Sequence, residues 1–168
     1  MKYERFEQLP VWQAGIELAV KTYAISKRPA LRRERGLRDQ MERAAVSVSN
    51  NIAEGFERGT TQELLTFLYI ARGSAGEVRS MLCLLERLPG FEDLKSQISD
   101  LKSLAESVSR QLRAWADSLQ NTKIAGQRYL TDKARRAQKD KKEREEFLAQ
   151  LDRMRSGESS AGSGEKAG

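Results

Sequence analysis

The sequence predicts an all-α fold, namely an antiparallel up-down-up-down four-helix bundle followed by a basic helical extension and a disordered tail. Apolar residues recur at steps of three and four in four long segments, which is typical of amphipathic helices. Strand signals are weak, because β-branched residues do not cluster and no Asn-Gly hairpin occurs. The short connections between the segments favour antiparallel neighbours. At 168 residues, 39% hydrophobic and 32% charged, the chain suits one compact domain with an appendage.

The first two expected helices cover about residues 11–27 and 37–56. Pro29 is expected to end the first helix, and Gly59 marks the turn after the second. The expected inward stripe of the first helix consists of Trp12, Ile16, Ala19 and Tyr23. The expected inward stripe of the second helix consists of Leu37, Met41, Ala44, Val48 and Ile52.

The third expected helix opens at Thr60, with Glu63 in capping-box spacing, and ends before Pro89-Gly90. Its inward stripe consists of Leu64, Leu68, Ala71, Ala75, Val78, Leu82 and Leu85. The fourth helix has the longest uninterrupted pattern, which comprises Leu94, Ile98, Leu101, Ala105, Val108, Leu112, Trp115 and Leu119. Alternating steps of three and four over such lengths favour packing of the helices into a bundle.

The composition changes after the fourth helix, which predicts three regions: a bundle over residues 1–121, a basic extension over 122–155 and a disordered tail over 156–168. The extension is rich in residues with good helix propensity, but its first part has no apolar face for docking. Phe147, Leu148, Leu151 and Met154 then restore a small amphipathic patch. The last region is a low-complexity sequence of Gly, Ser, Ala, Glu and Lys.

Positive charge is concentrated in two places, since residues 27–43 have a net charge of +4 and residues 123–144 of +6, within a total of +6. Clustered guanidinium and ammonium groups bind phosphate with strong salt dependence and little sequence preference. The alternative is an ordinary solvated surface. The candidate nucleic-acid-binding residues are Arg28, Arg32, Arg33, Arg35 and Arg38 in the first connection, and Lys133, Arg135, Arg136, Lys139, Lys141 and Lys142 in the extension.

The second and third helices contain a more specific pattern, QMERAAVSVSNNIAEG at residues 40–55, followed by Arg58, Thr60-Thr61 and GSAGE at residues 73–77. Together with the opening Leu9-Pro10-Val11-Trp12, this pattern resembles the small four-helix-bundle family encoded by intervening sequences of bacterial 23S rRNA genes. The similarity covers about residues 6–119. The connection between the first two helices departs from the family pattern, because it holds additional arginines.

More distantly, the chain resembles the accessory variability protein of diversity-generating retroelements. That resemblance implies a barrel-shaped homopentamer that binds RNA or DNA and associates with a reverse transcriptase. The family's gene location implies, by analogy only, an association with the ribosome or 23S rRNA. The basic extension lies outside the similarity.

The signature residues with a structural or interface role are Gln40, Arg43, Ser47, Asn51, Glu54, Gly55, Gly73, Ser74 and Glu77. Those of the second helix recur at steps of three and four and form a polar stripe beside the apolar one. We favour a structural interpretation, with partners on neighbouring helices or subunits, because the stripe is nearly charge-balanced; an anion or nucleobase site is the alternative. Gly73 and Gly76 are expected to permit close approach of another helix, with ligand access as the alternative.

The composition argues against several functional classes. The sequence holds no histidine and one cysteine, Cys83, which excludes histidine-ligated metals, the usual hydrolase triads and an internal disulfide. Glu54 and Glu57 lie three apart on one helix, unlike the carboxylates of a glycosidase, and no phosphate-binding loop motif occurs. We therefore expect no enzymatic activity, no cofactor and no metal. The absence of a signal peptide or apolar span predicts a cytoplasmic protein without membrane contacts.

These observations lead to two functional hypotheses. The first is a non-enzymatic homo-oligomer that gathers its arginines into one positive surface for RNA or DNA, as an accessory subunit of a retroelement reverse transcriptase. The second is a protein-interaction module whose C-terminal segment docks a partner through Phe147, Leu151 and Met154.

Overall fold

The computed structural model describes residues 3–121 and 143–149, and every regular element in that part of the chain is a helix, which confirms the all-α class. The chain divides into two units, Met1–Arg128 and Tyr129–Gly168. The first unit holds η1 (Phe6–Gln8), α1 (Pro10–Ser26), α2 (Pro29–Arg33), α3 (Arg35–Glu57), α4 (Thr61–Leu85), η2 (Glu92–Leu94) and α5 (Lys95–Gln120). In the second unit, residues 143–149 are helical. None of the described helices combines the length and the apolar character needed to cross a bilayer.

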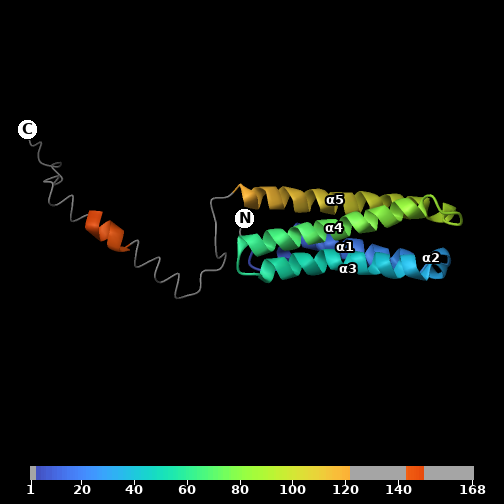
Figure 1. Ribbon diagram of the computed structural model, residues 1–168, viewed down its shortest axis with the longest axis horizontal. Coiled ribbons are helices and arrows are strands. Elements are labelled where there is room, and N and C mark those ends of the chain that lie inside the picture. Colours follow the sequence, from blue (N-terminus) through green and yellow to red (C-terminus); the bar gives the residue numbers. More distant parts are fainter. Residues whose placement is uncertain (1–2, 122–142, 150–168) are drawn as a thin grey trace, which may run out of the picture. The chain divides into compact units, whose positions relative to one another are not determined.

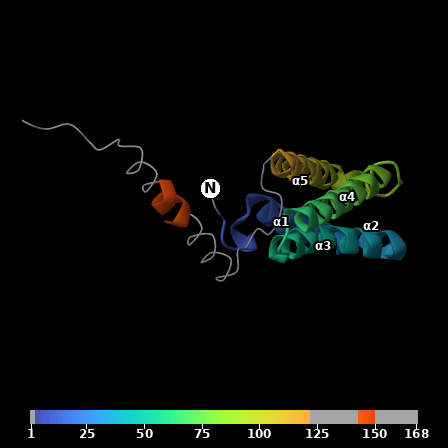
Figure 2. The same ribbon diagram turned by 60° about the vertical axis from the view of Figure 1, so that its left-hand side comes forward.

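The four long helices α1, α3, α4 and α5 lie side by side in the first unit (Figures 1 and 2). Helix α1 contacts α3 and α5, and α4 contacts the same two helices. In the part of the chain that the structure describes, no Cα atom of α1 lies within 8 Å of one of α4, and none of α3 lies within 8 Å of one of α5. The four helices therefore occupy the corners of a square in cross-section, with α1 diagonal to α4.

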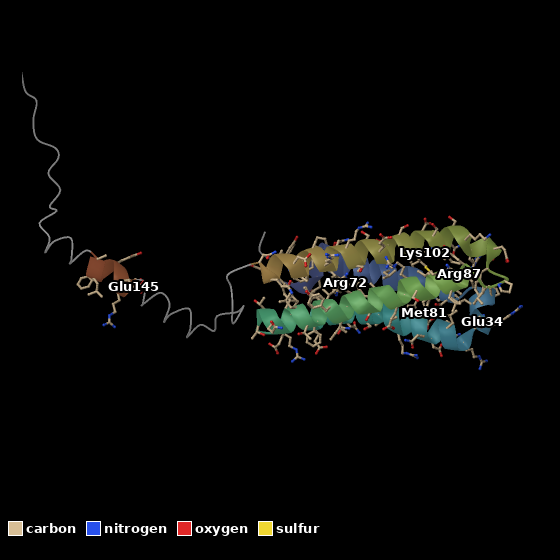
Figure 3. All side chains as sticks on the ribbon, turned by 45° about the horizontal axis from the view of Figure 1, so that its top comes forward. Glu34, Arg72, Met81, Arg87, Lys102 and Glu145 are labelled. Carbon is tan, nitrogen blue, oxygen red and sulfur yellow. The ribbon has the colours of Figure 1, made fainter. Side chains whose placement is uncertain are left out.

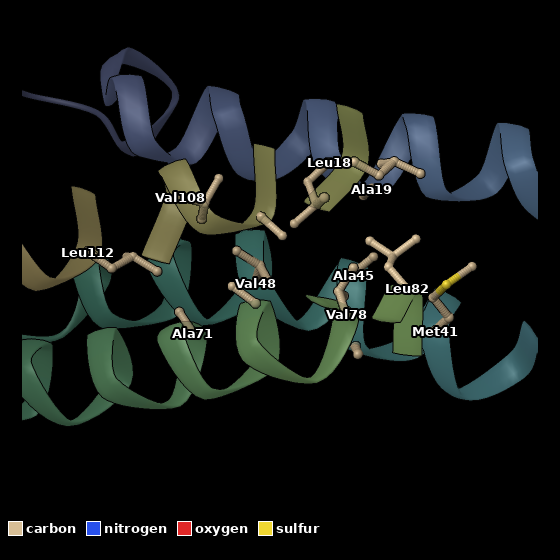
Figure 4. Close-up of a cluster of buried hydrophobic side chains, with 14 of the residues drawn as sticks. Leu18, Ala19, Met41, Ala45, Val48, Ala71, Val78, Leu82, Val108 and Leu112 are labelled. Carbon is tan, nitrogen blue, oxygen red and sulfur yellow. The ribbon is translucent and has the colours of Figure 1, made fainter. Parts of the chain in front are cut away.

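The core lies between these four helices, and close-packed side chains from all of them meet there (Figure 4). The predicted stripes of α3, α4 and α5 are confirmed, except that Leu37, Trp115 and Leu119 are half-buried. Fully burying one such aliphatic side chain contributes roughly 1.5–3 kcal/mol relative to leaving it exposed. The largest fully buried side chains are Leu18, Ile25, Leu31, Met41, Ile52, Leu64, Leu68, Leu82, Leu85, Leu94, Ile98 and Leu112.

The predicted stripe of α1 is wrong at Ile16 and Tyr23 and confirmed at Ala19, which is buried in the core. Ile16 is 37% exposed and Tyr23 is 43% exposed, while Trp12 is half-buried at the margin. Ala19 is joined in the core by Val11, Gly15, Leu18, Thr22 and Ile25. Gly15 and Thr22 have no aliphatic side chain to bury, so their burial depends on local contacts.

Those contacts explain why the stripe was misjudged. A Cβ on Gly15 would lie 3.3 Å from Val48 Cγ1 on α3, so glycine permits the close approach of α1 and α3. The Thr22 hydroxyl donates a hydrogen bond to Leu18 O at 2.7 Å, which removes the cost of burying a hydroxyl without a partner. A count of apolar residues does not detect either arrangement.

The connection between the first two long helices was expected to be a loop, but it holds the short helix α2. Pro29 stands in the first turn of α2, where proline's fixed φ and missing N–H are favourable. Leu31 is fully buried and fixes this short helix against the core. Helix α3 then begins at Arg35, two residues before the predicted Leu37.

The predicted start of α4 is confirmed, although the Glu63 carboxylate bonds the Thr60 hydroxyl in place of the Thr60 backbone N–H that a full capping box would use. The Oγ1 of Thr60 accepts a hydrogen bond from the Glu63 backbone N–H at 3.2 Å and donates one to the Glu63 carboxylate at 2.7 Å. In the connection between α4 and η2, Gly90 has a φ of 87°, a left-handed conformation that favours glycine. The predicted region boundaries after residue 121 lie outside the described residues.

Candidate nucleic-acid interface

Five arginines surround α2, and we call them the arginine cluster. They stand on α2 and its flanks. Leu31 holds one face of this short helix in the core, so the side chains on its other faces are exposed. Glu34, labelled in Figure 3, separates α2 from α3 at the same end of the unit. The cluster consists of Arg28, Arg32, Arg33, Arg35 and Arg38.

Two members of the arginine cluster have acidic partners. Arg28 lies 3.6 Å from the carboxylate of Asp93, in the η2 segment that precedes α5. Arg38 lies 2.7 Å from the carboxylate of the adjacent Asp39, and this hydrogen bond raises the pKa of the Arg38 guanidinium. The Arg28 pair is solvent-exposed, so it contributes little to stability, whereas the Arg38 pair is partly buried. Each pair reduces the positive charge available to a ligand.

Among the described residues, the other three members have no acidic partner. Arg32, Arg33 and Arg35 are exposed, and none forms an ion pair with any residue that the structure describes. A guanidinium group without a protein partner presents several N–H donors to a phosphate. The structure therefore reduces the predicted cluster to three available arginines on α2 and at the first residue of α3.

The polar signature stripe of α3 connects this helix to α4. Gln40 Nε2 donates to Glu77 Oε2 at 3.3 Å, and the hydroxyls of Ser47 and Ser74 lie 3.0 Å apart. Asn51 Nδ2 donates to both the backbone oxygen and the hydroxyl oxygen of Ser47, at 2.7 and 2.9 Å. Signature residues that are 27 to 37 positions apart in sequence thus bond one another between helices.

The ends of the stripe make more local contacts. Arg43 donates to Gln40 Oε1 at 2.6 Å. Glu54 accepts from Arg58 at 2.5 Å, and this hydrogen bond raises the pKa of Arg58. The Arg58 guanidinium also lies over the Phe67 ring, 5.1 Å from its centroid, a cation–π contact with α4.

The signature glycines have opposite surroundings. A Cβ on Gly55 would lie 2.7 Å from Phe67 Cβ, so this position requires glycine for α3 and α4 to pack. Around Gly73 and Gly76 an added Cβ would meet nothing within 4 Å. The predicted close approach of a helix to these two glycines is therefore wrong within the described part of the chain, where both face open space on α4.

A shallow groove runs along α3 on the side of α1, with a volume of about 390 Å³. Its lining combines an aromatic ring, an aliphatic side chain, two amides, a hydroxyl, one acid and one guanidinium: Tyr23, Arg43, Val46, Ser47, Asn50, Asn51 and Glu54. Sequence reasoning missed Tyr23, which was assigned to the core, and Asn50, which lies beside the polar stripe. The signal for Asn50 was its place in the signature string next to Asn51.

The basic candidates of the extension, Lys133, Arg135, Arg136, Lys139, Lys141 and Lys142, lie outside the described residues. In residues 143–149, the side chains of Phe147 and Leu148 are exposed. Leu151 and Met154, the other residues of the predicted docking patch, also lie outside the described part.

The described features define an all-helical protein with a polar α3–α4 contact, a basic end and a shallow polar groove. A model of the 23S rRNA-intervening sequence protein family matches residues 7–114, and the chain belongs to this family. A crystal structure of a protein of unknown function from the S23 ribosomal protein family of Bacteroides thetaiotaomicron is similar, with a TM-score of 0.55 and 23% identity over 63% of this chain and 97% of that one. That likeness concerns the fold. Among curated proteins no match is found.

Proposed function

We propose that this protein binds RNA or DNA through the arginine cluster and catalyses no reaction. The observation that carries the proposal is the group of three exposed arginines, Arg32, Arg33 and Arg35, without acidic partners in the described part of the chain. Because α2 is anchored by Leu31, these guanidinium groups stand on a fixed helical support. Contacts of this kind are made to backbone phosphate and have little sequence preference.

Family membership favours an RNA ligand, since the family is named after an intervening sequence of 23S rRNA. Ribosomal RNA is therefore one proposed ligand. The other is the RNA or DNA of a diversity-generating retroelement, with its reverse transcriptase as protein partner, as the signature at residues 40–55 suggests. Both ligands use the same phosphate chemistry at the arginine cluster.

We also propose that α1, α3, α4 and α5 form the antiparallel up-down-up-down bundle that the sequence predicts, with α2 inserted in the first connection. The closed order of helix contacts supports this topology, as do the short connections between consecutive long helices. The bundle is proposed to assemble into a homo-oligomer, with five copies suggested by the resemblance. Several apolar side chains on the outer faces of α1 and α4 are exposed, which supports association.

The second hypothesis, a partner docked by the C-terminal segment, is favoured by one observation. Phe147 and Leu148 are both exposed on the helical segment 143–149, which leaves two large apolar side chains for a partner to cover. Removing residues 122–168 should abolish capture of such a partner and leave binding at the arginine cluster in place.

The decisive experiment replaces Arg32, Arg33 and Arg35 together by glutamine. Log affinity falls with log salt, and loss of three phosphate contacts should make this fall shallower by about 2 units of slope per copy for single strands. Affinity at low salt should fall at least tenfold. Binding is measured by fluorescence anisotropy with a labelled RNA oligonucleotide at several salt concentrations, on the full-length chain.

A matched control removes the same charge elsewhere. Arg79, Arg110 and Arg113 are also exposed, but each has an acidic partner, and their replacement by glutamine should leave affinity within twofold. Equal loss in the two triple variants would mean that net charge alone governs binding. Unchanged binding in the Arg32, Arg33 and Arg35 variant would overturn the proposal.

A further inference from the structure

We propose that the groove along α3 binds an unpaired nucleobase stacked on Tyr23, so that the protein prefers single-stranded over duplex nucleic acid. This inference rests on the proposed function, because the arginine cluster supplies the phosphate contacts that bring the strand to the groove. It adds a second site with a different chemistry, in which a base is contacted in place of the phosphate backbone.

The groove has dimensions that suit a short stretch of single strand. It extends along α3 from Arg43 to Glu54, which is about 16 Å at the helical rise per residue. Its volume of about 390 Å³ falls in the lower part of the range for small-ligand sites. Tyr23 is the one described residue of α1 in its lining and forms the wall on that side.

Tyr23 provides the stacking surface. Its side chain is 43% exposed, although the spacing of apolar residues in the sequence predicts that it faces the core. Base stacking on an aromatic ring is tolerant of sequence and requires a base that is not already stacked in a duplex. A ring at the edge of a groove, half-covered and half-open, can contact one face of a base.

The asparagines provide groups for the base edge. The exposed Asn50 side chain forms no hydrogen bond within the described residues, so its carbonyl and its amino group are both available. Asn51 donates through Nδ2 to Ser47, which holds its side chain in place and leaves its Oδ1 as an acceptor. An asparagine amide matches the donor and acceptor pair of adenine.

The charges favour a base over a phosphate in the middle of the groove. Arg43 and Glu54, the two charged lining residues, lie at opposite ends and have opposite sign. Glu54 is already paired with Arg58, and Arg43 uses one guanidinium nitrogen on Gln40. The centre, at Ser47, Asn50 and Asn51, is neutral and polar.

The lining also disfavours a peptide helix as the occupant. Helix-in-groove recognition requires a row of apolar contacts, whereas Val46 is the one aliphatic side chain among the described lining residues. Tyr23 lies in the last turns of α1, six positions before Pro29 of α2, so a strand held by the arginine cluster passes close to the groove.

The test compares Tyr23→Ala with Tyr69→Ala on the full-length chain. Tyr69 is a matched control, since it is also 43% exposed but belongs to α4 and does not line the groove. The probes are a labelled single-stranded RNA 12-mer of adenines, the same length of uridines, and an RNA duplex. Affinities are measured by fluorescence anisotropy at one salt concentration, and thermal unfolding checks that both variants fold.

We expect Tyr23→Ala to weaken single-strand binding about tenfold and to leave duplex binding unchanged. Tyr23→Phe should retain the wild-type preference, and Tyr69→Ala should behave as the wild type. Asn50→Ala should weaken binding of the adenine strand more than that of the uridine strand. A merely structural role of Tyr23 would not produce this difference between single strand and duplex.

Other outcomes overturn the inference and are distinguishable. If Tyr23→Ala binds all probes as the wild type does while the Arg32, Arg33 and Arg35 variant does not bind, the groove proposal fails and the proposed function stands. If that arginine variant binds normally, the proposed function fails first. If Tyr23→Ala alters the sedimentation coefficient of the protein without altering the strand preference, a second copy occupies the groove.

Discussion

Individual glycines of the signature have roles that only their surroundings reveal. Gly55 packs where an added Cβ would come within 2.7 Å of Phe67 Cβ, and that atom belongs to the rigid start of a side chain on α4. Gly73 has the same intrinsic cost in a helix, but nothing lies within 4 Å of an added Cβ. One glycine therefore supports packing within the chain, and the other does not.

Replacing these glycines by alanine should change stability in opposite directions. Gly55→Ala should lower the free energy of unfolding by roughly 1–3 kcal/mol, because α3 and α4 must separate to accept the methyl group. Gly73→Ala should raise it by up to about 1 kcal/mol through helix propensity. Urea unfolding followed by circular dichroism measures both, and a destabilised Gly73→Ala protein would contradict this account.

At the scale of elements, α2 determines where the arginine cluster lies. The helix has five residues, too few to be stable alone, so its conformation depends on its contacts with the rest of the fold. Leu31 is its fully buried side chain. The position of the proposed ligand contacts therefore depends on the packing of one leucine, Leu31, in the core.

Leu31→Ala should lower the free energy of unfolding by about 2–5 kcal/mol. It should also weaken binding to single-stranded RNA, because the arginines lose their fixed support. The two effects are measured by urea unfolding and by fluorescence anisotropy at a temperature where the variant remains folded. Leu65→Ala on α4, a buried leucine far along the chain from α2, serves as control and should destabilise the fold with no loss of binding.

The elements also show how far the sequence predicts the fold. The stripes of α3, α4 and α5 were predictable because apolar residues, large ones such as Leu64, Leu68 and Leu82 or alanines, stand at each predicted core position. The stripe of α1 was not, since Gly15 and Thr22 face the core for reasons of contact geometry and hydrogen bonding. Helix α2 was missed because Pro29 signals a helix end and a helix start equally well.

The candidate site was predictable in part for similar reasons. Arginine positions are visible in the sequence, but their ion pairs are not: Asp93 reaches Arg28 from the segment before α5, 65 residues further along the chain by number. The groove could not be predicted from the sequence, because its prediction depends on the orientation of α1, which places Tyr23 outside the core. Long-range placement of this kind has no local signature.

On the scale of the whole molecule, two outer faces of the first unit expose apolar side chains. Val20 on α1 is 63% exposed, and Ile70 on α4 is 46% exposed. Because α1 and α4 occupy diagonal corners of the cross-section, these outer faces point away from each other. Two unlike faces favour a head-to-tail arrangement, in which the α1 face of one copy meets the α4 face of the next.

Val20→Glu and Ile70→Glu should each reduce the proposed oligomer to monomers, since each inserts a charge into one of the two surfaces. An equimolar mixture of the two variants should form dimers, because one intact α1 face and one intact α4 face are then available. Sedimentation velocity measures all three samples. Dissociation without recovery in the mixture would indicate that like faces meet.

The diagonal placement of those faces has a geometric consequence for the charge. Copies joined head to tail into a closed ring are related by rotation about one axis, so equivalent atoms of all copies stand at one height along it. Arg32, Arg33 and Arg35 would then form a circular belt of guanidinium groups. A flexible strand can follow such a belt from copy to copy, and the length of strand protected from nuclease would increase stepwise with the number of copies.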